Sequence, residues 1–371
     1  MIALITINDN NNIGNRLQNY AAFQLLEKYD TTFNVVRKYG CEYKHFPESD
    51  NSLKAFFRPI YYTFLEMLHP KRYCFKLKRA KNFARFNRLI ANGETLKYNF
   101  DYNKINDKYD YFFVGSDQVW NPNLVGNGMF INMLGFCNDS RKKCSLAASI
   151  SVDQLTDEQK EIFTRYLSDF SHISCREKNG SEMIESLINK KVVTLLDPTL
   201  MLDADDWKRI AKKPRFHKDN SPFVLLYFLG NITNDYENAI KQYSLKYNLR
   251  IINILDYANK YYCCGPSEFL WLLMNSSLVL TDSFHGCVFS FLFDKPFKIF
   301  TRVSKGQSMN SRITNLACAL KLPDSVFFDP RDDKTIDFKI YYDKTSLINE
   351  RNIFKAFLDG VFEQDAHEYE N

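Results

Sequence analysis

The chain has 371 residues, of which 45% are hydrophobic and 25% charged, with a net charge of +5 at neutral pH. This length and balance suit two ordinary globular domains and exclude a disordered chain. The opening MIALITINDN has neither a basic leader nor a long apolar core, and no apolar run reaches the length of a bilayer span. We therefore expect a cytoplasmic protein.

Short apolar runs alternate with helix-period segments from the start of the chain. The first apolar run covers 3–7, and a segment with helical spacing follows at 16–28. Such alternation is typical of a parallel α/β sheet. Further strands of a first domain are predicted at 34–37, 111–114, 144–147, 172–175 and 192–195.

A break in this pattern predicts the domain boundary. The stretch from Asp203 to Pro222 holds two prolines, several lysines and little apolar pattern, so we place a linker at 204–221. A second series of strands is predicted at 223–228, 250–254, 278–281 and 297–300. The fold class expected is α/β, with two Rossmann-like domains, 1–203 and 222–345, facing across a cleft.

The end of the chain, 346–371, predicts a helix that packs back onto one of the domains. Its apolar residues have helical spacing. They are Ile348, Ile353, Phe354, Phe357, Leu358 and Phe362.

Residues 71–88 hold eight Lys or Arg and no acid. One interpretation is contact with an anionic membrane surface at its inner face. The other is a solvated helix whose apolar stripe comprises Phe75, Phe83, Phe86 and Leu89. A nucleic-acid partner is excluded, because the rest of the chain is near neutral and carries no recognised nucleic-acid motif.

The nine cysteines are odd in number, form no CxxC pair and have no histidine at zinc-ligand spacing. We expect reduced structural thiols and no metal site.

Ligands of open parallel sheets gather beyond the carboxyl ends of the strands. The loop of residues 8–15 between the first strand and its helix makes Asn15 a candidate, although an ordinary loop would look similar. The 111–114 strand is followed by a carboxylate, amides and a large aromatic, a mix that suits a sugar: Ser116, Asp117, Gln118 and Trp120. The alternative is a helix cap with Trp120 in the core.

Two more strand ends carry candidate side chains. Arg176 ends the 172–175 run, and its planar charged fork suits a carboxylate or phosphate; the alternative is an ion pair with Glu177 or Asp197. His285 falls in the first turn of the helix predicted after 278–281, where backbone amides and the helix dipole converge. The alternative there is a structural histidine.

Five short segments, taken in order along the chain, resemble the polysaccharide pyruvyl transferase family. They are IGNRLQNY (13–20), GSDQVWNP (115–122), ISCRE (173–177), LDPTLML (196–202) and TDSFHG (281–286). NSRI (310–313) completes the set, and the similarity covers nearly the whole chain. The resemblance implies a GT-B-like fold and pyruvyl transfer from phosphoenolpyruvate, a co-substrate, with no cofactor. The acceptor would be a glycan or a lipid-linked saccharide.

The resemblance also implies site residues. Arg176 matches the family's donor-binding arginine and His285 its catalytic histidine. Many members carry an arginine where this chain has Ser283, so we expect Arg312 or Lys305 to supply that charge.

The remaining roles follow from the chemistry. Asp117 is the candidate base, and the acceptor contacts expected are Asn15, Ser116, Gln118 and Trp120. Two alternative functions stay open: a nucleotide-sugar glycosyltransferase of the same architecture, and a carbohydrate-binding homologue without activity.

Overall fold

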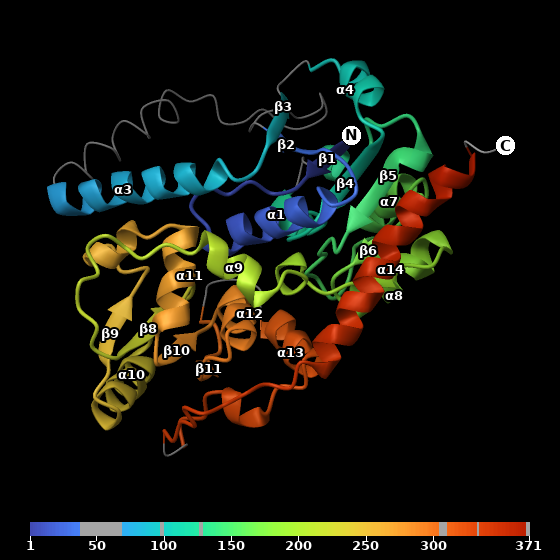
Figure 1. Cartoon of the computed structure of the whole chain (residues 1–371). Coiled ribbons are helices and arrows are strands. Elements are labelled where there is room, and N and C mark those ends of the chain that lie inside the picture. The colour runs from blue at the N-terminus through green and yellow to red at the C-terminus, as the bar shows by residue number, and fades with distance from the viewer. Residues whose placement is uncertain (38–68, 97–99, 126–128, 304–309, 332–333, 369–371) are drawn as a thin grey trace. The chain divides into compact units, whose positions relative to one another are not determined.

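The computed structural model describes residues 1–37, 69–96, 100–125, 129–303, 310–331 and 334–368 (Figure 1). The chain folds into two compact units. Unit 1 takes the described residues of Met1–Phe46, Arg88–Leu202 and Lys344–Asn371, and unit 2 takes those of Pro47–Asn87 and Asp203–Asp343. Each unit has its own parallel sheet with helices, so the predicted α/β class with two Rossmann-like domains is confirmed. That the two sheets face a common cleft stays a prediction.

The sheet of unit 1 has the order β3-β2-β1-β4-β5, and every pairing is parallel. This is the order of a doubly wound fold. Its strands are β1 (Ile2–Ile5), β2 (Thr32–Arg37), β3 (Asn92–Leu96), β4 (Tyr111–Gly115) and β5 (Lys143–Leu146). A short parallel pair, β6 (Ser174–Cys175) with β7 (Val193–Thr194), continues beyond β5 through single bridges.

The long helix α1 (Ile13–Leu26) leads from β1 to β2. Asn12 begins it by accepting a hydrogen bond from the backbone N–H of Asn15, and nearly every residue of the helix is buried. The other helices of unit 1 are α4 (Asn103–Lys108), α5 (Pro122–Val125), α6 (Met129–Asn132), η2 (Ser140–Lys142), α7 (Asp157–Leu167), α8 (Lys178–Ile188), η3 (Pro198–Leu200) and α14 (Thr345–Glu368).

The sheet of unit 2 has the order β11-β10-β8-β9, also all parallel. Its strands are β8 (Phe223–Tyr227), β9 (Arg250–Asn253), β10 (Leu278–Thr281) and β11 (Phe297–Ile299). Its helices are α3 (Pro70–Asn87), α9 (Ala204–Ile210), α10 (Asn234–Lys246), η4 (Lys260–Cys263), α11 (Pro266–Asn275), α12 (Phe284–Leu292), α13 (Asn310–Ala319) and η5 (Asp324–Val326).

Two segments differ from the expected domain boundaries. Residues 204–210 of the predicted linker form α9, whose Trp207 is fully buried with its ring 4.9 Å from that of Phe289. The basic helix α3 belongs to unit 2, although it precedes β3 of unit 1 in the chain. Its buried Arg79 donates to the carbonyl of Cys264 at 2.8 Å, which ties α3 to η4.

The C-terminal helix α14 packs on unit 1. The ring of Phe362 lies 4.7 Å from that of Tyr29, and Phe354 and Leu358 are buried. Ile348 and Ile353, expected in the apolar stripe, are 55% and 46% exposed. The buried face of α14 is therefore narrower than its apolar pattern predicted.

Candidate functional site

The strand orders place one topological switch point in each unit. In unit 1 the chain leaves β1 for β2 on one side, while β4 lies on the other. In unit 2 the same reversal occurs between β8 and β10. Ligands of open α/β sheets bind at the carboxyl end of such a crevice, and the sequence candidates lie at these two places.

At the switch point of unit 1, side chains tie the loop after β1 to the loop after β4. Thr6 Oγ1 donates to the carbonyl of Ser116 at 3.1 Å, and Asn15 Nδ2 donates to Asp117 Oδ2 at 2.7 Å. Asn15 Oδ1 in turn accepts from the N–H of Asp9 at 2.8 Å. The carboxylate of Asp117 is half-buried and accepts this hydrogen bond from a side chain of α1.

Gly115, the last residue of β4, has a φ of +128°, and a Cβ built there would lie 2.3 Å from the carbonyl oxygen of Leu146. We expect Gly115→Ala to lower the free energy of unfolding by at least about 1–3 kcal/mol, because a side chain strains this conformation. Gly360→Ala is the matched control. Its Cβ would meet nothing within 4 Å in α14, and alanine gains about 0.5–1 kcal/mol over glycine in a helix. Equal urea midpoints for the two variants would contradict the expectation.

The expectation that Trp120 contacts the acceptor sugar is wrong. Its side chain is fully buried, its Nε1 donates to the carbonyl of Asn132 at 3.0 Å, and its ring meets Phe170 edge-on. Trp120 is therefore a core residue. Ser116 and Gln118 are also buried, and Ser116 Oγ has no hydrogen-bond partner in the described chain.

Arg176 forms the ion pair that the sequence left open. Its Nη1 contacts Asp197 Oδ2, its Nε lies 3.9 Å from Glu177 Oε1, and the side chains of Arg176 and Asp197 are 5% and 0% exposed. Burial by itself lowers the pKa of Arg176, but attraction to Asp197, Glu177 and Asp117 raises it overall. Three carboxylates thus act on this one guanidinium.

Two polar groups of unit 1 were given no site role from the sequence, although Glu177 was named as a possible partner of Arg176. Glu177 is buried and accepts hydrogen bonds from Ser149 Oγ and, at 3.3 Å, from the N–H of Ile150. Arg16, buried in the first turns of α1, donates to Asn8 Oδ1 at 2.9 Å. Both lie in or next to strand-end strings already singled out, so the strand-end rule was sufficient to find them.

In unit 2, β10 leads into α12 at the switch point. Ser283 is the N-cap of α12, where its hydroxyl accepts from the N–H of Gly286 at 3.5 Å. His285 is the second residue of the helix and is 9% exposed. His285 therefore lies in the first turn of α12, as predicted.

Of the two cations expected to replace an arginine at position 283, one can be placed. The guanidinium carbon of Arg312 in α13 lies 5.2 Å from the ring centroid of Phe284, next to His285. Lys305 lies outside the described residues.

Asp282 and Arg302 were not among the sequence candidates for ligand binding. Asp282 is 1% exposed and accepts from the N–H groups of Leu229 and Gly230 at 2.6 and 2.7 Å. Arg302 Nη2 donates to the carbonyl of Asp282 at 2.9 Å. The loops after β8, β10 and β11 are thus joined at one point.

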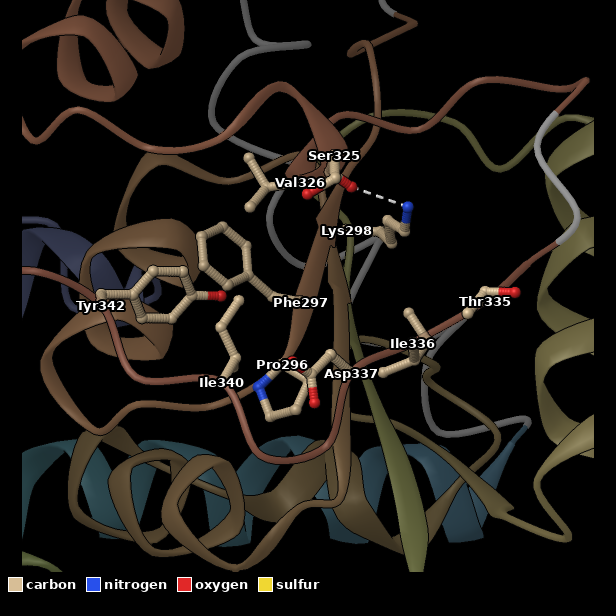
Figure 2. Close-up of a pocket in the computed structure, with 10 residues that line it drawn as sticks. All are labelled: Pro296, Phe297, Lys298, Ser325, Val326, Thr335, Ile336, Asp337, Ile340 and Tyr342. Atoms are coloured by element: carbon tan, nitrogen blue, oxygen red, sulfur yellow. Dashed lines mark hydrogen bonds between the residues drawn. The ribbon is translucent and has the colours of Figure 1, made fainter.

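A cavity of about 310 Å³ lies elsewhere in unit 2 (Figure 2). It is lined by the start of β11, by η5 and by residues 335–342, and Lys298 Nζ beside it donates to the carbonyl of Ser325 at 2.7 Å. Its lining is mainly apolar and includes neither His285 nor Arg302. The cavity is therefore separate from the switch point.

Three general expectations can be compared with the described part of the chain. Its eight cysteines are free thiols, and Cys41 lies outside it. No group of three or more His, Cys, Asp or Glu side chains in those residues is arranged to hold a metal ion. None of the described helices is long and apolar enough to cross a membrane.

Comparison with protein families gives one match. The model described as polysaccharide pyruvyl transferase covers residues 12–302, a stretch that includes both switch points from α1 to Arg302. No curated protein matches the chain.

Solved structures show weaker similarity. A UDP-GlcNAc 2-epimerase from Neisseria meningitidis bound to UDP-GlcNAc is 12% identical, with 98% of this chain and 100% of that chain covered and a TM-score of 0.48. A putative UDP-N-acetylglucosamine 2-epimerase from Listeria monocytogenes is 11% identical, with 98% and 97% covered and a TM-score of 0.47. At these identities and TM-scores, no ligand or activity of either protein is inferred for this chain.

Proposed function

Since the chain belongs to the polysaccharide pyruvyl transferase family, we propose that it transfers the enolpyruvyl group of phosphoenolpyruvate to two hydroxyls of a sugar. The products are a pyruvate ketal and phosphate. The observation that carries the proposal is the family match, which spans the strand ends of both units. The sugar would belong to a polysaccharide or to a lipid-linked precursor.

The reaction defines what the protein must supply. The methylene carbon of phosphoenolpyruvate takes up a proton, one sugar oxygen bonds to the neighbouring carbon, and the bond from that carbon to the phosphate oxygen breaks. A second hydroxyl then closes the ketal. Of the two hydroxyl protons, one ends on the methyl group and the other on phosphate. An acid, a base and fixed positive charge are therefore needed.

We assign the donor to unit 2. His285 delivers the proton, because an imidazole changes its charge near neutral pH and is here held in the first turn of α12. Arg312, whose guanidinium lies against Phe284, supplies positive charge to the anionic donor. The hydroxyl of Ser283 holds the helix start, so its contribution is to position His285.

We assign the acceptor to unit 1. Asp117 is the proposed base, since its half-buried carboxylate is fixed by Asn15 and lies at a strand end. Ser116 and Gln118 flank it. For Arg176, the contact with Asp197 supports a positioning role beside Asp117 over the expected donor contact.

A ligand panel tests the proposal. A ligand that binds only the folded chain raises the melting temperature, by an amount equivalent to about 2.7 kcal/mol at 100 times its Kd. We expect phosphoenolpyruvate to stabilise the wild type and UDP- or ADP-sugars not to do so. Stabilisation by a nucleotide sugar alone would replace pyruvyl transfer with glycosyl transfer. No stabilisation by any member of the panel would favour a homologue without activity.

We also propose that α3 contacts an anionic membrane at its inner face, where a lipid-linked acceptor would be found. Lys71, Lys78 and Lys81 are exposed, and α3 contains no acidic residue. The buried face of the helix, with Phe83 and Phe86, fixes it to unit 2. The solvated helix and the membrane interpretation are therefore compatible, because different faces carry them.

Charge reversal tests this contact. Each cation near an anionic surface contributes about 1 kcal/mol, so Lys71→Glu, Lys78→Glu and Lys81→Glu together should weaken vesicle binding by about 100-fold or more. The vesicles are phosphatidylcholine with and without phosphatidylserine. The control reverses three exposed lysines elsewhere, Lys178, Lys208 and Lys241, for the same change in net charge. Equal sedimentation of both triple variants would remove the membrane from the proposal.

A further inference from the structure

We propose that Arg302 is a second donor-binding residue: its guanidinium binds an anionic oxygen of the donor, and Asp282 is the residue that positions it. The inference deepens the proposed function and rests on it for the identity of the donor. Arg302 lies three residues after the end of β11, and its side chain is 12% exposed, so it is largely enclosed but still in contact with solvent.

The guanidinium contacts Asp282 at two atoms. Its Nη2 donates to the carbonyl of Asp282 at 2.9 Å, and its Nε lies 3.6 Å from Asp282 Oδ2. Asp282 immediately precedes Ser283, the N-cap of α12, so this bond places Arg302 beside the turn that presents His285. A fixed fork loses little freedom when it binds an anion, which favours arginine at such a position.

Asp282 itself is fixed by the loop after β8. Its two carboxylate oxygens accept from the N–H groups of Leu229 and Gly230 at 2.6 and 2.7 Å. A Cβ at Gly230 would lie 2.8 Å from Arg302 Cγ and 2.9 Å from Asp282 Oδ2, so only glycine permits this approach. Three strand ends thus contribute to the position of one guanidinium.

The charge around Arg302 differs from that around Arg176. Asp197, Glu177 and Asp117 all act on Arg176, and Asp197 contacts it directly. That cluster is net negative and would repel an anion. Arg302, in contrast, donates a hydrogen bond to a neutral carbonyl, and the carboxylate of Asp282, 3.6 Å from its Nε, makes its shorter contacts with backbone N–H groups. Arg302 therefore retains more attraction for a carboxylate or phosphate than Arg176 does.

Calorimetric titration of the full-length protein with phosphoenolpyruvate and with inorganic phosphate tests the assignment. We expect Arg302→Ala to lower the affinity for both ligands by about 10- to 100-fold, which is the range for the loss of a hydrogen bond to a charged group. Arg302→Lys should recover part of the affinity, and the affinity of Arg302→Ala should depend less steeply on salt. The matched control is Arg331→Ala, because Arg331 is an exposed arginine of unit 2 paired with Asp329.

The positioning role of Asp282 has its own readout. In Asp282→Asn we expect the KM for phosphoenolpyruvate to rise more than kcat falls. The amide has one acceptor oxygen for the two N–H groups of Leu229 and Gly230, so residue 282 and the carbonyl that holds Arg302 shift while His285 remains. Unchanged affinity in both Arg302 variants, with a wild type that binds phosphoenolpyruvate, would overturn the inference and leave the proposed function intact. If the wild type binds phosphate through Arg302 but does not bind phosphoenolpyruvate, Arg302 is part of an anion site. The proposal that phosphoenolpyruvate is the donor then fails.

Discussion

His285→Ala should lower kcat for phosphate release from phosphoenolpyruvate by about 100- to 10,000-fold, the usual contribution of a positioned general acid. The imidazole is held in the first turn of α12 and is still 9% exposed, so its removal leaves the apolar core untouched. The melting temperature should therefore change little. Phosphate release measured at saturating phosphoenolpyruvate gives the comparison.

A second histidine of the same unit provides the control. His217 is buried and its Nδ1 lies 2.9 Å from the hydroxyl of Tyr261, away from the switch point. His217→Ala should lower the melting temperature and leave kcat unchanged, the opposite of His285→Ala. If His285→Ala retains full turnover, the proton comes from another group and the proposed mechanism fails.

Arg176→Met should destabilise unit 1 by about 3–5 kcal/mol, because it leaves the carboxylate of Asp197 buried without its cation. Thr199 would still donate to Asp197 Oδ1, at 3.0 Å from its N–H and 2.7 Å from Oγ1, but neither group carries charge. Urea unfolding followed by circular dichroism measures the loss. The double variant Arg176→Met, Asp197→Leu should recover much of it, since no charge then remains unpaired.

The exposed pair Arg331–Asp329 is the control, since it shows how much stability is lost when a surface arginine is removed. Arg331→Met should change stability by no more than about 1 kcal/mol. If Arg176→Met unfolds like the wild type but no longer binds phosphoenolpyruvate, Arg176 belongs to the donor site as the family resemblance implied. A large loss of stability with donor binding retained at low denaturant would support the positioning role.

The strands were largely predictable from the sequence because most are short apolar runs between turn residues. β10 was located to the residue, and β8 and β4 to within one residue. β3, with the sequence NGETL, was missed, since a polar edge strand is recognised only by its pairing with β2. Apolar residues indicate burial, and an edge strand can form with little burial.

The domain membership of α3 and α9 was not predictable from local pattern. Arg79 reads as one more cation in a basic run, yet it is buried against carbonyl groups more than 180 residues away in the chain. Trp207 stands in a polar, proline-bearing stretch and is nevertheless part of the core. In both cases the contacts that decide burial join residues far apart in the chain, and local composition does not predict such contacts.

The positions of the candidate residues were predictable, but their contacts were less so. Asp117, Arg176 and His285 lie just after strands, as predicted, because strand ends follow from the apolar pattern; that they form the site stays a prediction. The apolar pattern does not predict which charged side chains pair with one another. Arg176 meets Asp197 and Arg302 meets Asp282 only because particular strands are neighbours in their sheets.

The path of the chain between the two units has a consequence for biosynthesis. Unit 1 is built from three separate stretches, the last beginning at Lys344, and unit 2 from two. A ribosome adds about 5–20 residues per second, so β1 to β5 must wait many seconds for α14 to emerge and cover Tyr29 and Tyr111. During that interval the nascent chain exposes aromatic surface. We therefore expect newly made chains to be clients of general chaperones until α14 has docked.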